Sequence, residues 1–314
     1  MKTARPLPDD FQDRPFTVAD AARAGVSDKR LRHRSLLRLG KGIRSGSPTA
    51  ELPLSIRVRP FIEVNERCAA ASHLTAAGLL VLPRRQQMGT PDMFHVIRPE
   101  GSAHLNRPHV IVHRMKLYTD EVTTVEGIPV TSPERTWLDM AELLSVAELV
   151  VMGDGCVRLP RAEFEDRDMP LCSLADLQRM IDKHKGKRGL RNAKEALSLI
   201  RVGSDSPQET LLRLAIVRAG LPEPELNVPI IGDDGLRRHE PDLSYRKYRI
   251  GVEYEGEHHG DEGQIVRDIA RSENYEALGW TEVRISKRHM VNDAKPAVAK
   301  IRTALVQAGW RKGH

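Results

Sequence analysis

The residues best suited to chemistry lie in the last third of the chain, in a predicted β-hairpin. The segments PDLSY and YRIGVEYEG flank a turn, and a symmetrical turn centred on residues 246–247 pairs Asp242 with Gly251. Strand alternation then places Gly251 and Glu253 on one side of the sheet, with Asp242 diagonal to Glu253. Two carboxylates beside a residue without a side chain leave a gap that suits a cation held by both acids and a backbone carbonyl.

Oxygen ligands of this kind are those that Mg²⁺ or Mn²⁺ prefers. Such an ion can activate water and neutralise the leaving oxygen of a phosphodiester. Glu255 shares the face of Glu253, and His258 and His259 follow the strand, where either could transfer a proton. The alternative is that alternating acids mark a solvated strand face. The convergence of acids and histidines on an otherwise apolar hairpin favours the metal site.

Several elements must position these acids. Ser206 to Glu209 has the form of a capping box, with Pro207 at the first helical position, so it predicts a helix that ends near Gly220. A helix further along places Arg267 and Arg271 on one face, where both could hold backbone phosphates. A mixed sheet flanked by helices follows from the predicted strands at residues 226–231 and 281–286 and the final helix at residues 293–308.

The N-terminal segment predicts a helix-turn-helix followed by a small β wing at residues 40–44. Thr17 caps a first helix that ends at Ala24, and Ser27 caps a second helix that ends near Gly40. We expect Leu31, Leu36 and Leu37 to pack behind this second helix. Its cations suit phosphates and base edges, namely Lys29, Arg30, Arg32, His33, Arg34 and Arg38. The alternative is a solvated basic helix.

The middle of the chain offers less chemistry. Residues 51–130 alternate strand-like runs (PLSIRVRPFIEV, DMFHVIRP and HVIVHRM) with polar loops and one helix that carries His73, a histidine to which we assign no chemistry. Ser132-Pro133 begins another helix. Asp139 and Asp154 are interpreted as helix-terminal or surface acids. A basic cluster that includes Lys187 and Arg188 is either a phosphate-tracking surface or a linker.

Composition limits the class of protein. The 314 residues carry a formal charge of +6, which is compatible with nucleic acid without requiring it, and apolar residues make up 40%. The three cysteines are far apart and predict neither a disulfide framework nor a zinc knuckle. No apolar stretch resembles a signal peptide or a membrane span, so we expect a cytoplasmic protein that does not enter the membrane.

Two resemblances cover most of the chain. SPQETLLR, EPDLSY, VEYEGEHHG and VRDIAR resemble the domain of unknown function 559, which is related to very-short-patch repair endonucleases of the PD-(D/E)xK superfamily. The segments FTVADAARAGVSDKRLRHRSLLRLGKGIR, ASHLTAAGLL and IPVTSPERTWLDMA resemble AbiEi type IV antitoxins, in which a winged-helix N-terminal domain binds promoter DNA. The combination implies an α/β multidomain protein: a winged helix-turn-helix at residues 1–50, a mixed α+β central domain at 51–175, a basic helical linker at 176–205 and a restriction-endonuclease-like domain at 206–314.

The nuclease resemblance also assigns roles. Glu209, Asp242 and Glu253 take the positions of the metal-binding acids, and Tyr254 offers its backbone carbonyl. Glu255 stands where many superfamily members have lysine. Either Glu255 is a further ligand, or another cation, Arg267 or a histidine of the 258–259 pair, takes the role of the lysine.

Two functions compete on this basis. The first is a Mg²⁺- or Mn²⁺-dependent endonuclease that hydrolyses double-stranded DNA in repair or phage defence. The second is a DNA-binding repressor or antitoxin whose nuclease-like domain is inactive and serves as a platform for a homodimer or a toxin partner. An RNA substrate remains a third alternative, which the helix-turn-helix disfavours.

Overall fold

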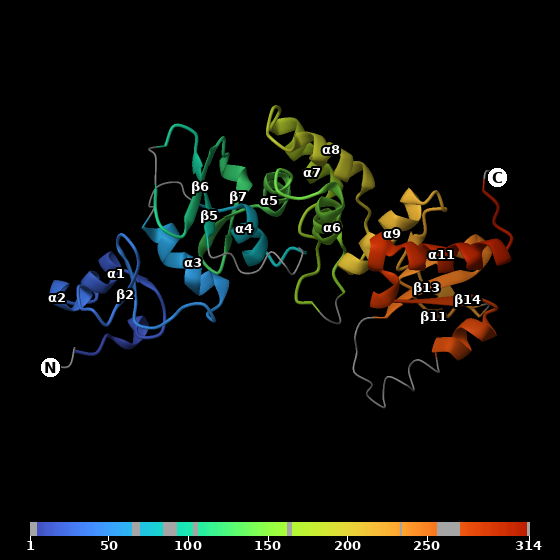
Figure 1. Ribbon diagram of the computed structural model, residues 1–314, viewed down its shortest axis with the longest axis horizontal. Coiled ribbons are helices and arrows are strands. Elements are labelled where there is room, and N and C mark those ends of the chain that lie inside the picture. The colour runs from blue at the N-terminus through green and yellow to red at the C-terminus, as the bar shows by residue number, and fades with distance from the viewer. Residues whose placement is uncertain are drawn as a thin grey trace. The chain divides into compact units, whose positions relative to one another are not determined.

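The computed structural model describes residues 5–64, 70–83, 93–102, 106–161, 165–232, 234–255 and 271–312. The chain forms two compact units, one of residues 1–143 with 176–190 and one of residues 144–175 with 191–314. Both units are mixed α/β, and each contains its own sheet and core (Figure 1). The expected division into four parts at residues 50, 175 and 205 stays a prediction.

The first unit begins with two short helices and a small sheet. Thr17 Oγ1 accepts the backbone N–H of Asp20, and Ser27 Oγ accepts that of Arg30, so the expected side chains cap both helices. Phe11, Phe16, Ala21, Leu31 and Leu36 form the core of this region. The antiparallel sheet has the strand order β1-β3-β2, and the elements are β1 (Phe16–Thr17), α1 (Val18–Arg23), α2 (Asp28–Leu31), β2 (Leu37–Gly40) and β3 (Ile43–Ser45).

The second helix is shorter than the sequence predicted. It ends at Leu31 instead of near Gly40, because Leu37 and Arg38 pair with β3 as part of strand β2. Arg38 therefore lies on the wing-like hairpin and Arg34 lies in the turn that precedes it. Leu31 and Leu36 are buried as expected, whereas Leu37 is 44% exposed, since strand alternation turns it away from the core.

A five-stranded sheet forms the rest of the first unit, with strand order β6-β5-β4-β8-β7. The pairs β5–β6 and β4–β8 are parallel, and the other two pairs are antiparallel. Its elements are α3 (Leu54–Glu63), β4 (Ala70–Ala71), α4 (His73–Leu79), β5 (Phe94–Pro99), β6 (Val110–Met115), β7 (Val122–Val125), β8 (Ile128–Thr131), α5 (Pro133–Met140) and α7 (Leu174–Lys183), most of which lies in this unit.

One strand expected in this region was wrong. The segment PLSIRVRPFIEV forms helix α3, and its buried residues Val58, Phe61 and Ile62 recur at the three- and four-residue spacing of one helix face. Helix α5 begins as expected, since Ser132 Oγ accepts the backbone N–H of Arg135.

Arg135 is fully buried and sits at the centre of an ionic network in the first unit. Its guanidinium pairs with Glu121 and with Asp139, whose Oδ1 lies 2.9 Å from Nε. His184 also contacts Glu121, with 2.7 Å between Nε2 and Oε1. Asp139 lies at the end of α5, as the helix-terminal alternative expected, but it is the internal partner of a buried cation, so the surface alternative was wrong.

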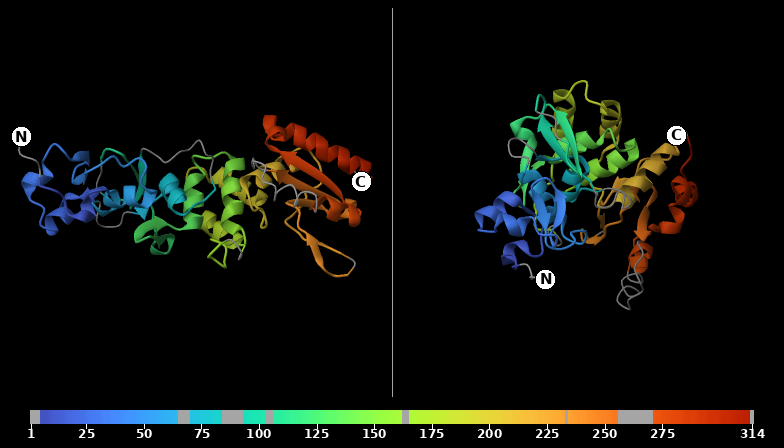
Figure 2. Two further views of the ribbon diagram at one scale, coloured as in Figure 1. Left: turned by 90° about the horizontal axis from the view of Figure 1, so that it is seen from below. Right: turned by 60° about the vertical axis from the view of Figure 1, so that its left-hand side comes forward.

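The second unit contains a four-stranded sheet with order β14-β13-β12-β9 and a separate hairpin, β10–β11, that extends from it as a narrow arm (Figure 2). Strands β13 and β14 are parallel, and the other pairs are antiparallel. The elements are α6 (Val146–Val157), α8 (Leu190–Leu199), α9 (Pro207–Arg218), β9 (Glu225–Leu226), β10 (Ile230–Ile231), β11 (Arg237–His239), β12 (Leu243–Tyr245), β13 (Ile250–Glu255), β14 (Thr281–Ser286) and α11 (Val291–Gln307).

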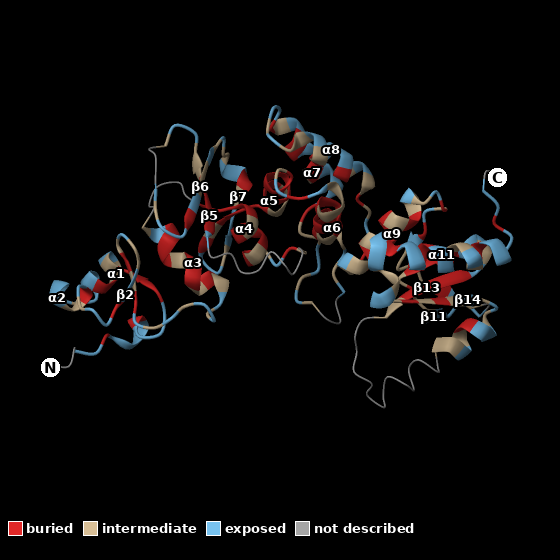
Figure 3. Ribbon diagram, viewed as in Figure 1, coloured by how far each residue is buried: buried red, intermediate tan, exposed pale blue. Residues whose placement is uncertain are grey.

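The core of the second unit lies where helices α9 and α11 pack against this sheet. Its buried residues include Leu212, Ile216 and Ile301 of the helices and Ile250 and Val252 of the strands. Figure 3 shows buried segments in the sheet strands. The capping box of α9 is present, with Ser206 Oγ accepting the backbone N–H of Glu209. Residues 271–277 are helical and belong to the predicted helix that precedes β14. No helix among the described residues is long and apolar enough to span a bilayer.

A second buried arginine joins α6 to α9. Arg213 has 1% of its side chain exposed, and its Nη2 lies 2.9 Å from Asp154 Oδ2. The same carboxylate accepts the hydroxyl of Thr210 and the backbone N–H of Arg201, each at 2.8 Å. Burial raises the pKa of Asp154, and the charge of Arg213 opposes that shift. Asp154 was also expected to be a helix-terminal or surface acid. It lies in the last turn of α6 but is buried, so the surface alternative was wrong.

We expect Asp154→Ala to lower the free energy of unfolding by about 3–5 kcal/mol, because it removes the buried partner of the Arg213 guanidinium and leaves only Glu223, which is 37% exposed. Urea titration followed by circular dichroism measures the change. Glu225→Ala is the matched control, since its carboxylate is 47% exposed and pairs with Arg246 at the surface, where the expected cost is about 0–1 kcal/mol. Equal losses in the two variants would contradict the role given to the buried pair.

Candidate functional site

The acidic residues of the second unit meet at the β12–β13 hairpin, in a register that differs from the predicted one. Ser244 pairs with Gly251 and Tyr245 with Ile250, so the continued register places Asp242 directly opposite Glu253. The turn is two residues longer than expected, because it contains a 3₁₀ turn and ends at Arg249 in the left-handed conformation (φ 49°). The shift is even, so each side chain keeps its expected face.

Asp242 is held by the backbone of the opposite strand. Its Oδ2 accepts the backbone N–H of Tyr254 at 2.7 Å. Burial raises the pKa of Asp242 to about 7, and the nearby carboxylates of Glu209 and Glu253 add to that shift. Burial also raises the pKa of Glu209, although its Oε2 accepts the backbone N–H of Asp205 at 2.9 Å and Asn227 Nδ2 at 3.0 Å. The fold therefore holds Glu209 and Asp242 against their mutual repulsion.

Glu253 is fixed by two donors that the sequence did not reveal. Tyr275 OH donates to its Oε1 at 2.7 Å, and His239 Nε2 donates to the same atom at 2.5 Å. The Tyr275 ring fills the space beside Gly251, where an added Cβ would lie 2.2 Å from the hydroxyl oxygen. The expectation that Gly251 leaves a gap for an ion was therefore wrong, because the glycine accommodates a tyrosine.

The remaining acid lies at the edge of the site. Glu255 is 40% exposed, with Arg284 Nη1 at 3.6 Å and Arg271 Nη2 at 3.9 Å. Arg271, a predicted phosphate contact, also pairs with Glu282 at 2.9 Å. Carboxylates of the same chain therefore already neutralise its charge. Arg284 lies on β14, where it pairs with Glu253 of β13. His258, His259 and Arg267 lie outside the described residues.

The donor set suits a hard divalent cation. Glu209, Asp242 and Glu253 offer carboxylate oxygens. A cation would offset both the burial that chiefly raises the pKa of Asp242 and the repulsion from Glu209 and Glu253 that adds to the shift. In the described part of the chain, however, one oxygen from each of these acids does not come within 4.8 Å of the others. Binding of one Mg²⁺ ion by all three acids would thus require movement of at least one of these side chains.

The predicted DNA-contacting cations of the first unit differ in accessibility. Lys29, Arg32, Arg34 and Arg38 are exposed, and Arg30 is half-buried, with its Nε donating to the carbonyl of Arg5. The basic cluster near residue 187 divides. Arg188 is exposed. Lys187 has only 8% of its side chain exposed, and its Nζ lies 3.0 Å from Asp139 Oδ1, so its assignment to a DNA-binding surface was wrong.

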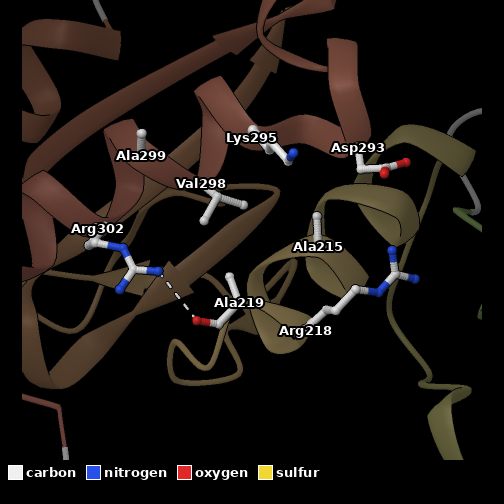
Figure 4. A pocket seen from close by; sticks show the side chains of 8 residues that line it. All are labelled: Ala215, Arg218, Ala219, Asp293, Lys295, Val298, Ala299 and Arg302. Carbon is white, nitrogen blue, oxygen red and sulfur yellow. Dashed lines mark hydrogen bonds between the residues drawn. The ribbon is translucent and has the colours of Figure 1, made fainter.

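A cavity of about 420 Å³ lies between helices α9 and α11 of the second unit (Figure 4). Arg218, Lys295 and Arg302 line it together with Asp293 and small apolar side chains. Arg302 Nη2 donates to the carbonyl of Ala219 at 3.3 Å, which anchors one of these cations. None of the clustered carboxylates lines this cavity, so the acidic site and the cavity are separate features of the unit.

Several site residues were not predicted because they are far in sequence from the acids that they contact. His239, Tyr275 and Arg284 act on the acids only through sheet pairing and helix packing. The one local signal for them is Gly251, a glycine inside a strand, which indicates the close approach of another group. Asn227 has no comparable signal, although it contacts Glu209.

Comparisons with known proteins place part of the chain. Residues 69–150 match the family described as AbiEi antitoxin C-terminal domain. An uncharacterized protein of Mycobacterium tuberculosis, Rv2248 in strain H37Rv and MT2308 in strain CDC 1551, is 29% identical over 162 residues. That alignment covers 51% of this chain and 56% of the relative, so the chain spans about half the length of the curated relatives it matches. No solved structure matches significantly.

The raised pKa of Asp242 predicts how stability depends on pH. The unfolded aspartate titrates near 3.8 and the folded one at about 7, so the Asp242 contribution falls as pH rises through this window and is constant above it. We expect Asp242→Asn, which keeps an oxygen for the Tyr254 N–H, to flatten this dependence and to raise stability at pH 8 by roughly 1–3 kcal/mol.

Chemical denaturation at several pH values between 4 and 8 measures the effect. Glu225→Gln is the control, because its exposed carboxylate should leave the profile unchanged. A wild-type profile that the Asp242→Asn variant reproduces at every pH would show that the acids do not repel one another as described.

Proposed function

We propose that this protein is a DNA-binding regulator of the type IV antitoxin kind, acting in the cytoplasm on double-stranded DNA. The observation that carries the proposal is the match of residues 69–150 to the AbiEi antitoxin C-terminal domain. A DNA-binding segment before that domain is consistent with it, and the first unit begins with two capped helices and a three-stranded sheet. We interpret this segment as a winged helix.

The charges of this segment support DNA as the partner. Lys29 projects from α2, Arg34 lies in the following turn and Arg38 lies on the β2–β3 hairpin, and all three are exposed. A helix and an adjacent hairpin that both carry cations can contact the phosphates of a groove and its border together. Under this proposal a toxin encoded beside this protein is its protein partner, and a homodimer would read a two-fold symmetric operator.

Removal of two of these cations tests the proposal. We expect the double variant Lys29→Ala/Arg38→Ala to bind a duplex from the DNA upstream of its own gene about tenfold or more weakly. We also expect the slope of log K against log salt to fall by about 2, since each lost phosphate contact removes about 0.9. Fluorescence anisotropy with the labelled duplex, repeated at several salt concentrations, measures both quantities.

The control variant Lys194→Ala/Lys312→Ala removes the same charge from exposed positions in the other unit. It should keep the wild-type affinity and slope. The proposal fails if the wild type binds this duplex no better than a scrambled one, or if both double variants weaken binding equally.

The acidic site favours a second candidate function, metal-dependent hydrolysis of DNA by the second unit. The supporting observation is the buried Asp242, which lies beside Glu209 and opposite Glu253 with its pKa raised to about 7. In this candidate the three acids hold Mg²⁺ or Mn²⁺, with Glu255 as a further ligand and Arg284 stabilising phosphate charge. The metal would activate the attacking water.

Plasmid cleavage in the presence of Mg²⁺ or Mn²⁺ tests this candidate. We expect wild type to nick or linearise the plasmid, and Asp242→Ala to lose more activity than the roughly 10–100-fold typical when a residue that only orients a metal ligand is removed. Glu225→Ala should cut like the wild type. Equal cleavage by wild type and Asp242→Ala, or none by wild type with either metal, would remove the nuclease candidate and leave the regulator.

A further inference from the structure

Three histidines that are far apart in sequence meet in the first unit. His73 begins helix α4, His95 lies in strand β5 and His113 lies in the neighbouring strand β6. One ring nitrogen of each lies within 4.8 Å of the others, and His95 Nδ1 is 3.0 Å from His113 Nε2. The ring of His73 stacks on that of His113, with 3.6 Å between the centroids. All three residues lie within the antitoxin-like segment.

The three rings are kept neutral. Burial lowers the pKa of His73 to about 3 and that of His113 to about 4, and it also lowers the pKa of His95. The cations of the neighbouring imidazoles and of Lys187 would oppose protonation further. A neutral imidazole keeps a lone pair on one ring nitrogen, which is the form that binds metal ions.

Two carboxylates, those of Glu142 and Asp139, lie close to the cluster. Glu142 Oε1 lies 3.3 Å from His73 Nε2, and Ser72 Oγ lies 3.0 Å from His73 Nδ1, so both ring nitrogens have polar neighbours. Asp139 is fully buried close enough to influence His73 and His113 electrostatically. Its Oδ1 pairs with Arg135 and Lys187, whereas its Oδ2 has no hydrogen-bond partner among the described residues.

A buried carboxylate oxygen without a hydrogen-bond partner lowers the stability of the folded state. Adjacent neutral imidazoles also lower it, because each has only one N–H to donate and a lone pair is left unsatisfied. A cation bound by the imidazoles removes the second cost and adds a positive charge that Asp139 attracts electrostatically. A histidine that donates its second N–H to a carboxylate is also the usual arrangement around metal ligands, because the carboxylate fixes the ring and increases its basicity. Glu142 is placed to do this for His73.

We propose that His73, His95 and His113 bind one transition-metal ion of the imidazole-preferring class, with Zn²⁺ as the best fit. Zn–N bonds of about 2.0–2.1 Å in a tetrahedral site separate two ligand nitrogens by about 3.3 Å, close to the observed 3.0 Å between His95 and His113. The stacked ring of His73 has to tilt to direct a nitrogen at the ion. The terminal torsion of histidine is broad, so the tilt costs little.

The proposed ion would cross-link three elements that are far apart in the sequence. It connects the start of α4 to β5 and to the edge strand β6, so binding stabilises the five-stranded sheet. The ligand chemistry differs from that of the acidic site in the second unit, since imidazoles select Zn²⁺, Co²⁺ or Ni²⁺ and carboxylates select Mg²⁺ or Mn²⁺. The inference is independent of the proposed DNA-binding function.

The experiment uses the full chain, freed of any affinity tag and of metal by chelation, and titrates it with Co²⁺ and Zn²⁺. We expect one Co²⁺ per chain with the visible absorption bands of a tetrahedral nitrogen site, displacement of Co²⁺ by Zn²⁺, and a higher midpoint of thermal unfolding with Zn²⁺. Mg²⁺ should neither displace Co²⁺ nor raise the midpoint of thermal unfolding. His113→Gln, whose ring is partly exposed, should weaken Co²⁺ binding at least about tenfold.

His33→Gln is the matched control, since it removes one histidine outside the cluster, whose side chain hydrogen-bonds to the nearby Ser35. It should bind Co²⁺ like the wild type. Circular dichroism of the metal-free variants checks folding, and His95→Asn replaces His113→Gln if the latter is unfolded. A wild type without the Co²⁺ bands, or equal Co²⁺ affinity in the wild type and the folded cluster variant, overturns the proposal and leaves a hydrogen-bonded histidine cluster.

Discussion

Arg213 leaves helix α9 with 1% of its side chain exposed, and its charge has to be neutralised inside the second unit. Asp154 provides that charge from α6, and its oxygens are further occupied by Thr210 and Arg201. The pair therefore fixes α9 against α6, and the start of α9 carries Glu209 toward the hairpin acids. Because a buried ion needs its partner in place, the position of the acidic site depends on a contact made one turn further along the same helix.

Local signals in the sequence were sufficient for much of this framework. The caps at Thr17, Ser132 and Ser206 act as their residue types suggest, and period-two alternation assigned the faces of β13 correctly. The register of the hairpin was wrong by two residues because the left-handed conformation of Arg249 is not visible in its residue type. The burial of Asp154 was missed because its partners are 47 to 59 residues away.

The two candidate sites differ in how far apart their residues lie in the sequence. The acids of the second unit were found because three of them lie on one hairpin, whereas the donors that restrain Glu253 come from β11 and from the helix before β14. The histidine cluster was missed because its members are separated by about twenty residues each and meet only through the parallel pairing of β5 with β6. Sheet pairing between distant segments is the information that one sequence does not supply.

The contact between Gly251 and Tyr275 limits how this domain can vary. The phenol ring occupies the volume that any side chain at position 251 would need, and its hydroxyl group holds Glu253. A larger residue at position 251 is therefore tolerated only with a smaller residue at position 275, which would release the acid. In an alignment of relatives, positions 251 and 275 should therefore covary. Relatives in which both have changed should also lack a glutamate at position 253, so the two positions indicate whether the acidic site is retained.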